Sequence, residues 1–99
     1  MSQGSSITPH AALLRVLIPG ESEGPELIRK VRDWTEGKIE LDDPVFVAVI
    51  QELETSGLVE HHLGAADKRT GEPHLTYALT PAGKVSAMAI LAASLTRRG

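Results

Sequence analysis

The chain has 99 residues, of which 41 % are hydrophobic and 23 % are charged, as in one small globular domain. A domain of this size buries only about 60 to 65 % of the surface of its unfolded chain, so a deep catalytic cavity is not expected. The absence of cysteine excludes disulfides, cysteine zinc sites and thiol catalysis. A net charge of −3 counts against a protein whose only task is to grip polyanionic phosphate.

The two ends of the chain carry no targeting or membrane signal. The first residues lack the charged region and the long apolar segment of a signal peptide. The longest nearly apolar run, from Ala87 to Leu95, is shorter than the roughly 20 residues that span a bilayer. We therefore expect a cytoplasmic protein without a membrane partner.

Two helices are predicted in the first third of the chain. Thr8 followed by Pro9 is typical of a helix start, and apolar residues recur at helical spacing until Pro19. A second helix restarts around Pro25 and ends near Gly37. Its apolar stripe consists of Leu27, Ile28, Val31 and Trp34.

A third helix is predicted to begin at Pro44, with Asp42 or Asp43 as its cap, and to end at Gly57 in a left-handed conformation. The i, i+3, i+4, i+7 pattern predicts that the core side consists of Phe46, Val49, Ile50 and Leu53. The opposite face then consists of Val47, Ala48, Gln51 and Thr55.

The remaining segments read as a hairpin and a closing helix. The stretches LVEHHL (58–63) and HLTYALT (74–80) are strand candidates separated by a polar turn, and Thr80 with Pro81 starts the last helix. On that helix, Val85, Met88, Ala89 and Ala92 are predicted to cover the core. This assignment leaves a second apolar surface, which we expect to form a homodimer interface, at Ile90, Leu91 and Leu95.

Three helices, a two-stranded β-hairpin and a closing helix are the order of a winged helix-turn-helix domain. The predicted fold class is therefore mainly α with a hairpin (α+β). We expect a flexible N-terminus at 1–7, the winged helix-turn-helix domain at 8–80, and a C-terminal dimerisation helix at 81–99, packed on the same domain.

Four blocks of the sequence resemble the PadR-like family of bacterial regulators. They are LLRVL, GPEL (24–27), LETSGLVE (53–60) and YALTPAG (77–83). The resemblance extends from about Ala11 to the end of the chain. It implies a dimeric transcriptional regulator with the third helix in the major groove of double-stranded DNA and the hairpin tip at the neighbouring backbone or minor groove. It also implies a small hydrophobic effector bound near the dimer interface.

Within this fold, the candidate DNA-binding residues come from three places. On the third helix, Gln51 could pair with adenine, and Val47 or Ala48 could contact a thymine methyl group. At the hairpin tip, Lys68 and Arg69 could contact phosphate or enter the minor groove. On the second helix, Arg29 and Lys30 could position the backbone, although a solvated face with a Glu26–Lys30 pair is the simpler interpretation.

The third helix departs from the family's pattern. Where the family tends to offer hydroxyl, aromatic and basic groups, this chain presents Val45, Val47, Ala48 and Gln51, preceded by Asp42 and Asp43. Carboxylates within a Debye length of about 8 to 10 Å repel phosphate. The alternative hypothesis is therefore a protein-interaction module that has lost DNA binding and docks a partner, for instance a basic one, through the apolar and acidic face of this helix.

Catalysis and metal binding are not expected, and no cofactor is predicted. No nucleophile and base recur with a recognisable catalytic spacing. Histidines at 61, 62 and 74 lie on the two hairpin arms, where a cross-strand pair could bind zinc or nickel. Because adjacent His61 and His62 point to opposite faces of a strand, exposed strand histidines are the better interpretation.

Overall fold

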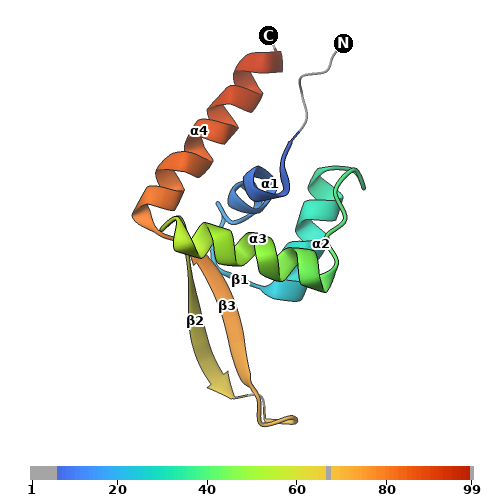
Figure 1. Cartoon of the computed structure of the whole chain (residues 1–99), viewed down its shortest axis with the longest axis vertical. Coiled ribbons are helices and arrows are strands. Elements are labelled where there is room, and N and C mark those ends of the chain that lie inside the picture. The colour runs from blue at the N-terminus through green and yellow to red at the C-terminus, as the bar shows by residue number, and fades with distance from the viewer. Residues whose placement is uncertain (1–6, 67, 99) are drawn as a thin grey trace.

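The computed structural model describes residues 7–66 and 68–98, and its element order is that of a winged helix (Figure 1). Side chains at 65, 66, 73 and 94–98 are not described, and most of the predicted N-terminal segment 1–7 lies outside the described residues. The elements are α1 (Pro9–Val16), β1 (Ser22–Glu23), α2 (Gly24–Trp34), α3 (Asp43–Thr55), β2 (Val59–Ala66), β3 (Pro73–Leu79) and α4 (Pro81–Arg98).

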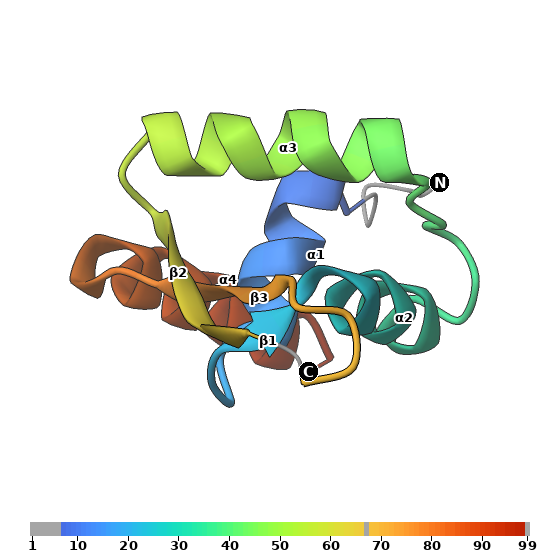
Figure 2. The same cartoon turned by 90° about the horizontal axis from the view of Figure 1, so that it is seen from below.

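Helix α1 lies at the centre of the helical body. Figure 2 shows α3 on the outside of the body above α1, with α2 to one side and α4 on the other side of α1 from α3. Thr8 is the predicted cap, and its hydroxyl accepts a hydrogen bond from the Ala11 amide at 3.1 Å. The three helices predicted before the hairpin are thus confirmed.

The strands form one antiparallel sheet in the order β1-β3-β2, and the hairpin β2–β3, hereafter the wing, extends well beyond the helices (Figure 1). The wing is longer than predicted, and the third strand, β1, was not predicted at all. Two residues are too short for an alternating pattern to identify a strand. Strand β1 pairs only at Ser22 with Tyr77 and at Glu23 with Thr76.

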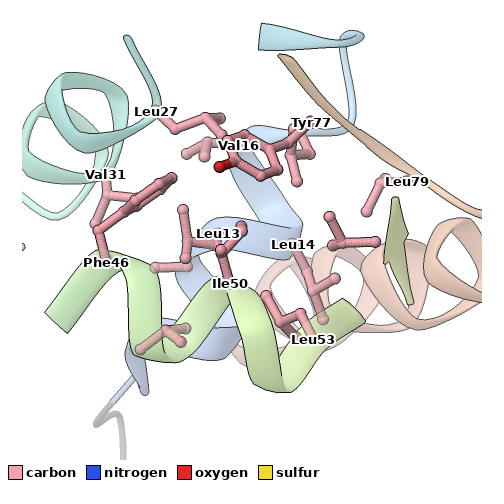
Figure 3. Close-up of a cluster of buried hydrophobic side chains, with 14 of the residues drawn as sticks. Leu13, Leu14, Val16, Leu27, Val31, Phe46, Ile50, Leu53, Tyr77 and Leu79 are labelled. Carbon is pink, nitrogen blue, oxygen red and sulfur yellow. The ribbon is translucent and has the colours of Figure 1, made fainter. Parts of the chain in front are cut away.

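The core consists of aliphatic side chains around α1, with one aromatic pair (Figure 3). Phe46 of α3 meets the ring of Tyr77 of β3 edge to face, with centroids 5.7 Å apart. Leu13, Leu27 and Val31 are fully buried. The predicted core side of α3 is confirmed, since all four residues are buried: Phe46, Val49, Ile50 and Leu53.

The end of α3 and the start of α4 meet in one junction. The Thr80 hydroxyl donates to the Gly57 carbonyl at 2.6 Å and accepts from the Gly83 amide at 3.0 Å, so it caps α4 and ties it to the end of α3. Gly57 has the predicted left-handed conformation, with φ of +78°. A Cβ atom at Gly83 would lie 1.9 Å from the Leu58 carbonyl oxygen. Only glycine allows this approach, which explains the last residue of the YALTPAG block.

The predicted faces of α4 were wrong. Val85 and Met88, which we expected to cover the core, are 73 % and 52 % exposed, whereas Ala87 is fully buried and Ile90 packs against the core. The physical reason is the contact at Gly83, because it sets the rotation of the helix and places Ala87, four residues on, against the body. Within the described part of the chain, no helix is both long and apolar enough to cross a membrane.

Candidate nucleic-acid interface

The outer face of α3 is apolar in the middle and acidic at its start. Asp42 caps the helix, because its carboxylate accepts a hydrogen bond from the Val45 amide at 3.1 Å. Asp42 and Asp43 are nonetheless exposed to solvent. Val45 and Val47 are 43 % and 47 % exposed. The helix contains no lysine or arginine.

The predicted base-reading residues lie on this outer face. Gln51 and Ala48 are exposed and line a shallow, open depression along α3 together with Glu52, Thr55 and Ser56. Glu52 contacts His10 of α1 at one edge of the depression. The arrangement leaves the Gln51 amide able to meet a base edge, with a carboxylate one residue away.

The tip of the wing carries the basic residues predicted there. Lys68 and Arg69 are exposed in the turn between β2 and β3, far from the helical body (Figure 1). The molecule measures 49 Å along its longest axis and 28 Å along the next. The wing therefore sets its charges apart from the acidic start of α3 (Figure 1), and exposed charges separated by more than a Debye length, about 8 Å at physiological ionic strength, are largely screened from each other.

The three basic residues of α2 differ in what holds them, and Arg32 pairs with the neighbouring Asp33, with 3.4 Å between Nη2 and Oδ1. Lys30 is half-buried, and its ammonium group donates to the Ser22 hydroxyl at 3.1 Å and lies 3.7 Å from the Glu26 carboxylate. Arg29 is exposed. The structure thus contains the Glu26–Lys30 pair of the simpler interpretation, and Lys30 also holds α2 to β1.

Every histidine of the chain faces a carboxylate, which the sequence did not predict. On the α3 side of the wing, His61 contacts Glu54, near the end of α3. On the opposite face, His74 Nδ1 lies 2.9 Å from Glu23 of β1. His62 Nδ1 lies 3.2 Å from Glu21 on that same face. The contacts of His62 with Glu21 and of His74 with Glu23 join chain segments that only the sheet brings together, so no sequence spacing signals them.

Two of these groups have shifted pKa values. The hydrogen bond to Glu21 raises the pKa of His62, with a smaller contribution from Glu60. The hydrogen bond from the Thr76 hydroxyl lowers the pKa of Glu21, and His62 lowers it further. In the core beneath the wing, burial raises the pKa of Tyr77, as does the charge of Glu54.

The histidines do not form a metal centre with one another. Across the hairpin, His61 pairs with Tyr77 and His62 with Thr76, so neither lies opposite His74. Among the described residues, no group of three or more histidine, aspartate or glutamate side chains is arranged to hold a metal ion.

The predicted dimer residues occupy different environments on α4. Ile90 packs against the core and Leu91 is half-buried, whereas the side chain of Leu95 is outside the described part. The exposed stripe of this helix consists of Val85, Met88, Ala89 and Ala92. It follows i, i+3, i+4, i+7 spacing and is therefore one continuous apolar face.

No protein-family model and no curated protein sequence matches the chain. Solved structures do. A transcriptional regulator from Clostridium thermocellum has a TM-score of 0.68 at 22 % identity, over 91 % of this chain and 86 % of its own. Bacillus subtilis PadR in complex with operator DNA has a TM-score of 0.69 at 18 % identity, over 83 % and 45 %. RosR from H. salinarum has a TM-score of 0.68 at 23 % identity, over 96 % and 80 %.

The chain therefore has the winged-helix fold of PadR-like transcriptional regulators, and the predicted resemblance and the α+β fold class are confirmed. The likeness to these three structures covers 83 % to 96 % of this chain and is therefore a likeness of nearly the whole described fold.

Proposed function

We propose that the protein is a PadR-like, DNA-binding transcriptional regulator that acts as a homodimer, and not an enzyme. The observation that carries the proposal is the pairing of an exposed third helix with a long wing that has basic residues at its tip. The likeness to PadR, a protein whose solved structure contains operator DNA, supports this function.

The charges divide the work between the two DNA-contacting elements. Lys68 and Arg69 would supply the phosphate contacts, which provide most of the salt-dependent affinity. The outer face of α3 would supply base contacts through Gln51 and methyl contacts through Val47 or Ala48. Because α3 has no cation and two carboxylates at its start, its contribution is selectivity rather than affinity. Arg29 would add a contact from α2.

Dimerisation would take place through α4. Its exposed stripe, from Val85 to Ala92, is apolar, and a two-fold axis would cover it with the same stripe of a second copy. Leu91 borders the stripe, and Ile90 lies on the side of the helix that packs against the core. Two copies would present two wings and so double the phosphate contacts. This doubling matters because one wing tip offers few cations and the domain as a whole has a net negative charge.

A protein-docking function is the alternative, and the exposed valines of α3 favour it. Val45 and Val47 stand beside Asp43, which suits an apolar partner surface bordered by lysine or arginine. In that case α3 would bind a basic protein segment, and the wing tip would not contribute. Lys68 and Arg69 are therefore needed for binding if the protein is a DNA-binding regulator, and they are not needed if it docks a protein.

The test is fluorescence anisotropy of the purified protein with mixed genomic DNA fragments at about 50 and 200 mM salt. The regulator predicts saturable binding that prefers some fragments and weakens steeply between the two salt concentrations. Absence of binding at the lower salt concentration contradicts the regulator and directs the search to a basic protein partner.

A further inference from the structure

His62 lies where the wing leaves the body. Its cross-strand partner is Thr76, and Thr76 is also paired with Glu23 of β1, so this is the last rung in which three strands are paired. Beyond it the hairpin has two strands, and the register shifts between Leu63 and Ala66. A two-stranded hairpin is at best marginally stable on its own. The base of the wing is held by the buried side chains of Val59, Tyr77 and Leu79, so contacts at this rung affect how firmly the part of the wing beyond it is held to β1.

Both ring nitrogens of His62 face carboxylates. Nδ1 is 3.2 Å from Glu21, and Nε2 is 3.3 Å from Glu60 of the same strand. A neutral imidazole has one N–H group, so it can donate to one carboxylate and must turn a lone pair toward the other. The imidazolium donates to both. This geometry therefore holds together best when the ring carries its second proton.

The Glu21 carboxylate joins three segments of the chain. It precedes β1, accepts a hydrogen bond from the Thr76 hydroxyl of β3, and faces His62 of β2. A protonated His62 thus links both arms of the wing to the segment that leads into β1. A neutral His62 keeps at most one of its two carboxylate contacts, and the link to Glu21 competes with the one to Glu60.

Other ionisable groups surround this rung on both faces of the wing. On the same face, Glu23 of β1 contacts His74 of β3. On the face toward α3, Glu54 contacts His61 of β2. The His62 side chain is 47 % exposed, so its contacts are screened by solvent. Screened contacts adjust the attachment of a marginal hairpin and leave the helical body unaffected.

We propose that His62 is a positioning residue whose protonation attaches the wing to the β1 segment and thereby makes DNA binding stronger near pH 6 than near pH 8. The second half of this statement rests on the proposed function, and the first half concerns the free protein alone. His62 acts on DNA only through the position of the wing, since the residues proposed to contact DNA there are Lys68 and Arg69.

The first experiment is an NMR pH titration of the free protein. The His62 ring is expected to titrate above the ordinary histidine range. The protection factors of the wing amides beyond Thr76 are expected to fall as the pH rises and the ring loses its second proton. Glu60→Gln should lower the midpoint of His62, because a glutamine amide can satisfy Nε2 of a neutral ring. His10→Gln, a variant that removes a histidine–carboxylate contact outside the wing, should leave both readouts unchanged.

The proposal is overturned if His62 titrates in the ordinary range, or if the wing amides do not follow its titration. These outcomes require no DNA, so they are independent of the proposed function.

The second experiment measures DNA affinity at about pH 6 and pH 8 at constant ionic strength. The wild-type chain is expected to bind roughly threefold to tenfold more weakly at the higher pH, as linkage requires when DNA binding favours the protonated ring. His62→Gln should remove most of this difference, and His10→Gln should keep it. The same difference in His62→Gln would assign it to general charge and overturn the positioning role. No binding at either pH would refute the proposed function, while the NMR titration still decides the attachment of the wing.

Discussion

The helical body and the wing are held together by different forces. In the body, aliphatic side chains from α1, α2 and α3 are buried around Leu13. At the base of the wing, Val59, Tyr77 and Leu79 belong to the same core. Farther out, the apolar pair Leu63 and Leu75 faces solvent, and the contacts with β1 and its flanking residue are hydrogen bonds and histidine–carboxylate contacts. The body therefore responds to changes of volume, whereas the outer part of the wing responds to changes of charge and pH.

The largest expected difference between the two regions is the loss of stability when a single methyl group is added to the body or to the wing. Gly83→Ala should destabilise the fold by about 3 kcal/mol or more, because the new Cβ would collide with the Leu58 carbonyl. The matched control is Gly64→Ala in the wing, where the nearest atom outside the neighbouring residues is 3.7 Å away, so stability should change little. Urea unfolding of both variants provides the measurement. Equal losses would refute the different packing of the two regions.

A second effect separates the regions by function. Lys68→Ala combined with Arg69→Ala should lower DNA affinity about tenfold and reduce the salt slope by roughly 1 for each lost phosphate contact. Lys84→Ala, at an exposed lysine of α4, serves as the control and should do neither. Anisotropy titrations at several salt concentrations give both quantities. An unchanged slope in the double variant would remove the wing tip from the DNA interface.

A smaller effect is expected on the outer face of α3, which belongs to the body but contributes nothing to its core. Asp43→Asn should raise DNA affinity about twofold to threefold at low salt by removing an exposed charge that repels phosphate. Glu36→Gln removes a charge after α2 and is the matched control. If Asp43→Asn leaves DNA affinity unchanged and weakens the capture of a basic peptide, the protein-docking alternative is favoured.

The smallest effect concerns stability against pH. The pKa of His62 is raised on folding, so its contribution is complete below the ordinary histidine value of 6.5 and is lost as the pH rises through the folded value. The pKa of Glu21 is lowered, so its contribution is present above 4.5 and is lost as the pH falls through the folded value. Wing attachment should therefore be strongest between these limits. Wing-amide protection factors measured across this range provide the check, and a maximum above pH 8 would contradict it.

The sequence predicted those parts of the fold that follow from periodicity and capping. The core side of α3, the cap at Thr8 and the left-handed Gly57 were all identified correctly, because each depends on residues close together in the chain. The rotation of α4 was not predicted correctly, because the contact between Gly83 and Leu58 outweighs the apolar pattern of the helix. The glycine of the YALTPAG block was the available signal, but a glycine at a helix start points to a close approach only once its partner is known.

The candidate site divides in the same way. Exposure of Val47, Ala48 and Gln51 followed from the helical pattern, and exposure of Lys68 and Arg69 followed from the polar turn. The anchoring of Lys30 by Ser22 and the carboxylates around His62 did not, because β1 is too short to be recognised and brings Glu21 and Glu23 to the wing from about 40 to 55 residues away in the chain. The roles of the candidate residues in DNA contacts and in dimer contacts stay predictions.

The junction at Thr80 also has a mechanical consequence. Leu58 links α3 to β2, Thr80 links β3 to α4, and the two are joined by hydrogen bonds and by the close approach of Gly83. A displacement of the first turn of α4 must therefore move the end of α3 and the base of the wing together. Any event that tilts α4 would therefore move α3 and the wing in one concerted displacement and not in two separate ones.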